Sequence, residues 1–242
     1  MTTVVLDTNI WIYLTSDSYF ELWQKLKEMK ENKDINIVVN DIIMLEWERN
    51  RETTIKNLID NIKREYRSAK NLASYLPSDA KNAFLKNISE YQEEKNRVKM
   101  AENRVKEVEA FMHSCNMFKV TNDQKLFVSE LAINKVPPFQ NNKNNFNDAL
   151  IIRNVSEGIK QTDFNKYDLI FVSNNPDDFI DKSSKQPYPD LFKGLENIKL
   201  KTVTELGEAL KLAPELFDGF DEWVESQLEA EALSAWEISR GK

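Results

Sequence analysis

Short runs of apolar residues alternate with longer segments in which apolar residues recur every three or four positions. The short runs predict buried strands at residues 3–6, 35–39, 117–120, 169–172 and 198–203. The longer segments predict amphipathic helices between these strands. Regular alternation of strand and helix is typical of an α/β fold. We therefore expect a three-layer α/β sandwich, with helices on both faces of a parallel, roughly five-stranded sheet.

The stretch from residue 50 to residue 113 interrupts this alternation. Its apolar positions keep helical spacing, and Pro77-Ser78-Asp79 is the one clear break. We expect a charged antiparallel helical hairpin, with residues 79–112 forming its second helix in one piece. The hairpin would be inserted into a discontinuous α/β domain made of residues 1–49 and 114–204. The pattern leaves open whether it is a structural arm, a surface for homo-oligomer formation or a grip on substrate.

Residues 205–242 form an acidic C-terminal helical region in this interpretation. Thr204 is predicted to cap a short helix at 205–210, and Pro214 to start the rest of the region. The chain has a net charge of -7 at pH 7, and this region carries ten acids and three bases, which accounts for all of it. It is a candidate surface for a protein partner.

The remaining 204 residues are neutral overall, but one segment is basic. Residues 49–70 hold seven bases against three acids. An acidic protein can therefore still present a local surface for nucleic acid. The candidate nucleic-acid-binding residues are Arg49, Arg51, Lys56, Lys63, Arg64, Arg67 and Lys70.

The composition limits the kinds of metal site that the chain can form. It has one cysteine, Cys115, and one histidine, His113, out of 242 residues. An internal disulfide and a thiolate- or histidine-rich zinc site are thereby excluded. A bound metal must be held by oxygen, which favours Mg²⁺ or Mn²⁺. We interpret Cys115 as a buried thiol and His113 as a structural residue.

The start of the chain shows no targeting signal. Met1 is followed directly by Thr2-Thr3 and a predicted strand, without a basic region or a cleavage site. No apolar run approaches the roughly 20 residues that a membrane span needs. We expect a cytoplasmic protein without a membrane partner.

Three carboxylates occupy positions that a parallel sheet would bring together. Asp7 ends the first strand, Glu46 lies in the helix after the second strand, and Asp148 opens the helix before the fourth. In a parallel sheet these positions meet at the carboxyl edge, where α/β proteins place their sites. Further oxygen or amide groups near this edge, as additional ligands or orienting residues, are Thr8, Asn9, Ser173, Asn174, Asn175, Asp177 and Asp178.

Carboxylates arranged in this way can hold two hard cations that activate water for an in-line displacement at phosphorus. Each acid also has a simpler explanation. Asp7 could cap the following helix, Glu46 could be a solvated helix residue, and Asp148 could be an ordinary charge at a helix amino end. Their joint occurrence at compatible positions favours the metal site.

These residues also carry a resemblance to a known family. Residues 4–12 (VVLDTNIWI) resemble the opening strand and helix of PIN-domain nucleases. Residues 44–47 (MLEW) and 147–151 (NDALI) are similar to the segments that hold the family's second and third acids. The resemblance covers roughly residues 1–50 and 115–205, and implies Mg²⁺- or Mn²⁺-dependent cleavage of RNA, less often of DNA. It assigns metal binding to Asp7, Glu46 and Asp148.

The family's closing element is similar to residues 171–179 (FVSNNPDDF), with a difference. Asn175 stands where an acid is common, and one extra residue precedes Phe179. The fourth ligand is then Asn175, Asp177 or Asp178, and we favour Asp178. The helical insertion, followed by Pro137-Pro138-Phe139, is similar to a longer bacterial subgroup of PIN-like proteins.

The sequence predicts a metal-dependent nuclease, with an endoribonuclease favoured. A phosphatase of the haloacid-dehalogenase type is the rival enzyme, but it needs an acid where Asn9 stands. From another class, the chain could be a catalytically weak PIN-like module that binds nucleic acid or a partner. Such a module could serve as the effector of a toxin–antitoxin or defence system.

Overall fold

Five parallel strands form the centre of the structure, a computed structural model that describes residues 1–140, 145–159, 166–175, 180–181 and 187–213. The strand order is β3-β2-β1-β4-β5, and every neighbouring pair is parallel. The predicted α/β class and parallel sheet are confirmed. The strands are β1 (Thr2–Leu6), β2 (Ile35–Asn40), β3 (Asn116–Phe118), β4 (Leu169–Val172) and β5 (Leu200–Val203).

Strand β3 begins and ends earlier than the predicted range of 117–120. Its pairing with β2 stops at Phe118, opposite Asn40. Two residues later, the backbone N–H of Val120 donates to Oδ1 of Asp41 at 3.1 Å. Asp41 is the first residue of the helix that follows β2, and its side chain takes over the hydrogen bond that a partner strand would provide, so the chain leaves the sheet here.

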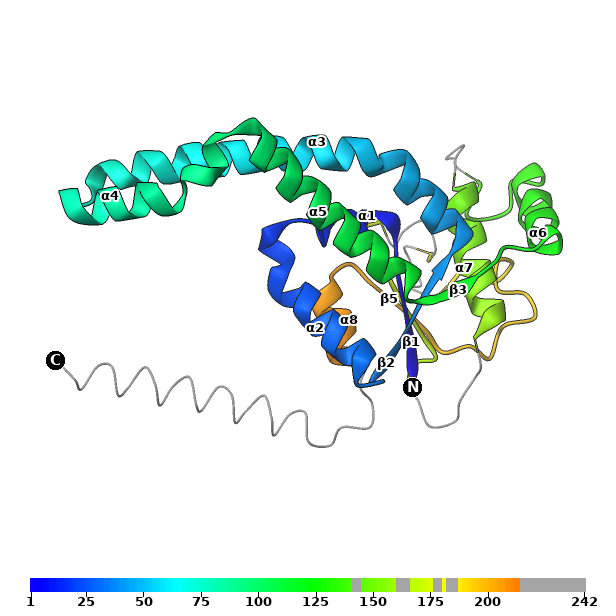
Figure 1. Cartoon of the computed structure of the whole chain (residues 1–242). Helices are drawn as coiled ribbons and strands as arrows, with labels where there is room; N and C mark the ends of the chain where they lie inside the picture. Colours follow the sequence, from blue (N-terminus) through cyan, green and yellow to red (C-terminus); the bar gives the residue numbers. More distant parts are fainter. Residues whose placement is uncertain (141–144, 160–165, 176–179, 182–186, 214–242) are drawn as a thin grey trace.

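Helices pack on both faces of the sheet. Figure 1 shows α2 and α8 on one side of it and α6 and α7 on the other. Branched apolar residues fill the interior, and β1, β2 and β4 are almost wholly buried, as expected for central parallel strands. The bounds are α1 (Thr8–Tyr13), η1 (Asp17–Tyr19), α2 (Phe20–Glu31), α6 (Asn122–Ile133), α7 (Phe146–Gly158) and α8 (Leu206–Leu212).

The end of the described chain differs from the prediction in one detail. Glu205, not Thr204, is the N-cap residue of α8, and its side chain makes no capping hydrogen bond. The helix therefore starts one residue later than predicted, at Leu206. The acidic region predicted from Pro214 lies outside the described residues. No helix in the described ranges is long and apolar enough to cross a bilayer.

Residues 50–113 form an arm that reaches away from the sheet (Figure 1). Its outgoing leg is α3 (Asp41–Leu72), one helix of 32 residues that starts inside the α/β body. The turn at the far end contains η2 (Ala73–Tyr75). The returning leg was predicted as one helix but is divided into α4 (Ser78–Asn87), η3 (Ser89–Gln92) and α5 (Glu94–His113).

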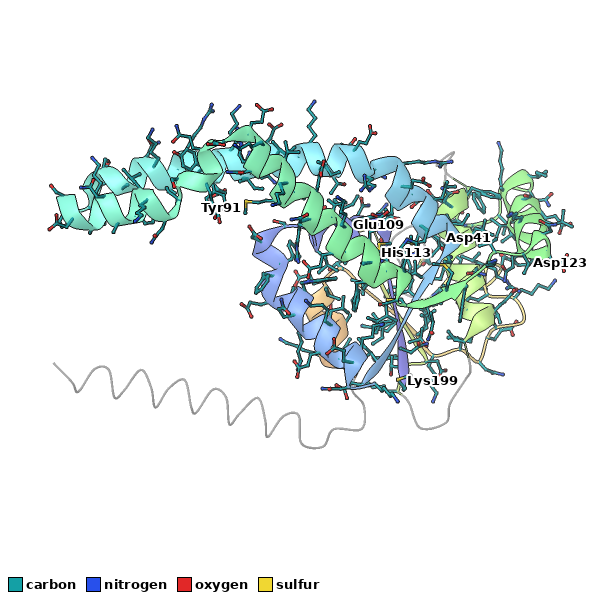
Figure 2. All side chains as sticks on the ribbon, viewed as in Figure 1. Asp41, Tyr91, Glu109, His113, Asp123 and Lys199 are labelled. Carbon is teal, nitrogen blue, oxygen red and sulfur yellow. The ribbon has the colours of Figure 1, made fainter. Side chains whose placement is uncertain are left out.

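A buried arginine explains the break in the returning leg. Nη1 of Arg97 donates to the carbonyl oxygens of Tyr91 and Gln92 at 2.7 and 2.6 Å. Nδ2 of Asn96 donates to the carbonyl oxygen of Glu90 at 2.9 Å. These side chains satisfy backbone acceptors that an unbroken helix would have paired internally. Tyr91 marks the position of the break in Figure 2, where polar side chains project from the arm along its length.

The root of the arm is fixed to helix α2. Trp23 is fully buried, its ring meets Phe111 of α5 edge-on at 4.9 Å, and its Nε1 donates to Glu107 at 2.9 Å. Burial raises the pKa of Glu107, but the hydrogen bonds from Trp23 and Arg104 outweigh it, so the pKa is lower than usual. The Arg51–Glu109 ion pair, 3.4 Å between Nε and Oε2, joins the two legs. The part of the arm nearest the sheet therefore packs against the α/β domain.

Candidate functional site

Asp7 lies at the carboxyl end of β1, where its backbone N–H donates to the carbonyl oxygen of Val172 at 2.9 Å. The residue is 8% exposed, and its carboxylate accepts a hydrogen bond from Oγ of Ser173 at 3.0 Å. The backbone N–H of Asn175 in turn donates to Oγ of Ser173 at 3.2 Å. Asp7 occupies the N-cap position of α1 but makes no side-chain capping bond. Helix capping therefore does not account for this acid.

Glu46 connects three helices through one carboxylate. It lies in the second turn of α3 and is half-buried. Oε2 accepts from the hydroxyl of Thr8 on α1 at 2.7 Å, and Oε1 accepts from the amide of Asn147 on α7 at 2.7 Å. The side chain thus faces the sheet edge rather than open solvent. Each carboxylate oxygen keeps further acceptor capacity beside these bonds.

Asp148 follows Asn147 in the first turn of α7 and is half-buried. It therefore lies at the same sheet edge as Glu46, with the positive end of the helix dipole behind it. Asn147 had no assigned role in the sequence interpretation. The only signal for it was an amide directly before an acid at a helix start.

The other predicted polar residues divide into three groups. Thr8 and Ser173 are buried and bond to the acids, whereas Asn9, Asn174 and Asn175 are exposed at the same edge. The predicted fourth ligand and its alternative acid, Asp178 and Asp177, lie outside the described residues.

The donor set at this edge consists of oxygen and amide groups. Among the residues that the structure describes, no group of three or more His, Cys, Asp or Glu side chains could by itself hold a metal ion. Within the described ranges, Asp7, Glu46 and Asp148 are therefore not gathered into a ready-made metal site, although all three lie near the carboxyl edge of the sheet. Such an open set of hard oxygen donors suits Mg²⁺ or Mn²⁺, which keep several water ligands when they bind to few carboxylates.

A buried asparagine sets the positions of the two helices that carry Glu46 and Asp148. Oδ1 of Asn40 accepts from the backbone N–H of Ile43 at 3.0 Å and so caps α3. Its Nδ2 donates to Asn154 of α7 at 3.3 Å. Asn40 is fully buried. The start of α3 and the middle of α7 are thus held by one side chain.

We expect Asn40→Ala to lower the free energy of unfolding by about 2–3 kcal/mol, because it removes a helix cap and leaves one buried donor, the N–H of Ile43, and one buried acceptor, Oδ1 of Asn154, without this partner. Thermal or urea unfolding measures this loss. Asn32→Ala, which changes an exposed asparagine after α2, is the matched control and should be nearly neutral. A wild-type unfolding curve for Asn40→Ala would show that the cap and the bond to Asn154 contribute nothing.

The seven basic candidates do not share one environment. Arg51 pairs with Glu109, and Nη2 of Arg64 donates to Asn61 at 2.6 Å. The other five are exposed, and none of them forms an ion pair within the described ranges. We call these five the basic stripe: Arg49, Lys56, Lys63, Arg67 and Lys70.

His113 and Cys115 form no catalytic pair. His113 is exposed, whereas the Cys115 thiol is buried and donates to the carbonyl oxygen of Phe111 at 3.3 Å. Burial raises the pKa of Cys115 to about 12. The thiolate, which is the nucleophile, is therefore scarce near neutral pH.

We expect Cys115 to be alkylated by iodoacetamide at pH 8 roughly 10²–10³-fold more slowly in the folded protein than in urea, since the raised pKa lowers the thiolate fraction. Mass spectrometry of timed samples measures the two rates. Rapid labelling of the folded protein would contradict the buried position.

A family model described as PIN domain matches residues 4–179. The match includes Asp7, Glu46 and Asp148 as well as the arm. No curated protein and no solved structure matched the chain.

Proposed function

This chain belongs to the PIN-domain family, whose members are generally nucleases, and we propose that it is a metal-dependent nuclease that cleaves RNA in preference to DNA. The observation that carries the proposal is the set of hydrogen bonds that holds two of the acids, Glu46 and Asp7, at one sheet edge. Glu46 is bonded to α1 and α7, and Asp7 is bonded to the residue after β4. Four separate segments thus contribute to one site, as a catalytic centre at the carboxyl edge requires.

Asp7, Glu46 and Asp148 would hold Mg²⁺ or Mn²⁺ in this proposal, with Asp178 as the favoured fourth ligand. The bound ions would supply an activated water and neutralise charge on the phosphate. Thr8 and Asn147 fix both oxygens of Glu46, and Ser173 fixes one oxygen of Asp7. Such outer partners orient the ligands and tune their basicity.

A catalytically weak binding module is the second candidate. Two observations favour it: an asparagine at position 175 where the family commonly has an acid, and the absence of a closed metal group among the described residues. A module of this kind would bind nucleic acid or a partner protein without cutting, for example as the effector of a toxin–antitoxin or defence system.

A cleavage assay separates the two candidates. End-labelled single-stranded RNA, structured RNA, and single- and double-stranded DNA are incubated with the protein in Mg²⁺, Mn²⁺ or EDTA. We expect RNA to be cut with either metal and to remain intact in EDTA. Binding that survives EDTA, without cutting in any metal, would favour the binding module.

The basic stripe supports a substrate-binding role for the arm. Arg49, Lys56, Lys63 and Lys70 are each seven residues apart, nearly two helical turns or about 10.5 Å. They therefore share one face of α3, opposite the packed face that holds Trp47 and Leu58. The stripe begins one turn after Glu46. A strand bound along it would be led toward the acids, with the phosphates supplying affinity.

Neutralising part of the stripe should weaken RNA binding and reduce its dependence on salt. We expect the triple variant Lys56→Gln, Lys63→Gln, Arg67→Gln to lower the slope of log K against log salt by about 2, at roughly 0.7 for each single-strand phosphate contact. Fluorescence anisotropy over a salt series measures the slope.

The matched control carries the same change of charge at exposed positions off the stripe: Lys86→Gln, Lys99→Gln and Lys125→Gln. Equal slopes for the two triple variants would show that only net charge matters, and would remove the stripe from the proposal.

A further inference from the structure

A cavity of about 590 Å³ opens at the carboxyl edge of the sheet, between α1, α2 and α8. Tyr13 and Tyr19 form one wall, and Asn174, Thr204 and Glu205 contribute polar groups. The metal-binding and stripe residues do not line it. Its volume is in the range of small-molecule sites and exceeds that of a single nucleobase.

Two residues that line the cavity are close in sequence to residues that bond to the acids. Asn174 directly follows Ser173, which donates to Asp7. Ile10, in the cavity wall, lies two residues after Thr8, which donates to Glu46. The cavity and the acids thus lie on the same edge of the sheet, so a single strand that spans this edge could contact both.

The tyrosine wall is an aromatic surface suited to a flat ligand. The rings of Tyr13 and Tyr19 stack with centroids 5.7 Å apart and an angle of 14° between planes. Tyr13 is 40% exposed, although it lies on the first helix of the body. This stacking restricts the orientation of both rings. Proteins that bind single strands use such side chains as platforms for unpaired bases.

The charge of the cavity favours a base over a phosphate. The side chain of Glu205 is exposed and makes no hydrogen bond or ion pair within the described part of the chain, although the residue is the N-cap of α8 and its backbone oxygen accepts from the N–H of Ala209. A carboxylate repels phosphate but accepts hydrogen bonds from ring and exocyclic N–H groups. Guanine presents two such donors side by side, matching the two oxygens of one carboxylate.

We propose that this cavity binds a guanine base of single-stranded RNA, next to the phosphodiester held at the acids, with Tyr13 as its stacking partner and Glu205 as its hydrogen-bond acceptor. This inference rests on the nuclease function proposed above. The bound guanine would determine which phosphodiester of the strand is cut. Fully paired duplex RNA would not satisfy the site, because its bases remain stacked within the helix.

The test uses short oligouridine strands with a single guanine moved along the sequence. The wild-type protein should cut at a fixed distance from the guanine wherever it stands. Tyr13→Ala should lose roughly 5- to 150-fold in affinity, the range for one base–aromatic stack. Glu205→Gln should lose the preference for guanine over adenine. Tyr75→Ala, which removes a tyrosine that is 86% exposed on the arm, is the matched control and should behave as the wild type.

A second measurement does not depend on cutting. The guanine is replaced by the fluorescent guanine analogue thienoguanine, which keeps the ring N–H and the exocyclic amine, and the titration is done in EDTA. Quenching on binding that Tyr13→Ala abolishes and Tyr75→Ala retains would support the cavity, even if no RNA were cut and the nuclease proposal failed. Cutting that ignores the guanine, with equal quenching in all variants, would overturn the cavity and leave the nuclease intact. Circular dichroism checks that Tyr13→Ala is folded, and the exposed Glu205→Gln provides an independent variant.

Discussion

Replacing Asp7 with asparagine is expected to lower the kcat of RNA cleavage by about 10³-fold, because it removes a ligand from interactions worth several kcal/mol in the transition state. The fold should survive the change. Asparagine keeps an oxygen that can accept the hydrogen bond from Ser173, and the site loses a nearly buried charge. Kinetics with saturating Mg²⁺ or Mn²⁺ measure the loss.

Asp123→Asn is the matched control, since Asp123 is exposed in the first turn of α6 (Figure 2). It should cut RNA at the wild-type rate. A second readout is the melting temperature with and without metal, because a ligand that binds only the folded state raises it. Asp7→Asn should lose that rise. Wild-type cleavage by Asp7→Asn would remove the acid site from the mechanism.

Replacing Trp23 with alanine is expected to have the largest effect on stability, about 3–5 kcal/mol. The ring is fully buried, it packs edge-on against Phe111, and the guanidinium of Arg104 lies 5.1 Å from its centroid. Its loss also leaves Glu107 without one hydrogen-bond donor. For a protein of this size, the melting temperature should fall by roughly 6–20 °C.

Trp23→Phe separates packing from hydrogen bonding, because it keeps an aromatic ring but not the indole N–H. We expect an intermediate loss of stability in thermal unfolding. Tyr75→Ala should melt close to the wild type. If Trp23→Ala melted there too, the packing of α2 against α5 would not stabilise the protein.

The sequence predicted the sheet well because buried parallel strands leave a plain signal. β4 was predicted with its exact bounds, since four apolar residues end there at a polar turn. Asn40 stands between an apolar run and a helical pattern, where asparagine commonly caps a helix, and its side chain does accept from the N–H of Ile43. The alternation of strand and helix also placed Asp7 at the end of β1, whereas metal binding by Asp7, Glu46 and Asp148 stays a prediction.

The features that the sequence did not reveal depend on contacts between distant residues or on which hydrogen-bond partner a side chain takes. The break before α5 has no proline or glycine; Arg97 creates it by bonding to carbonyl groups five and six residues earlier. Nothing local indicates that Asn147 donates to Glu46, 101 positions away. The separation of Arg51 from the basic stripe depends on Glu109 in the opposite leg. Such partners are visible only once the chain has folded.

Helix α3 is one unbroken rod from the acid site to the far turn of the arm. Glu46 lies near one end and Leu72 at the other, about 39 Å away at 1.5 Å per residue. A force applied at the distal end is therefore transmitted along the helix to Glu46, whose carboxylate is held by Thr8 and Asn147. If the arm binds RNA as proposed, the load on the arm therefore acts on the same helix that positions Glu46.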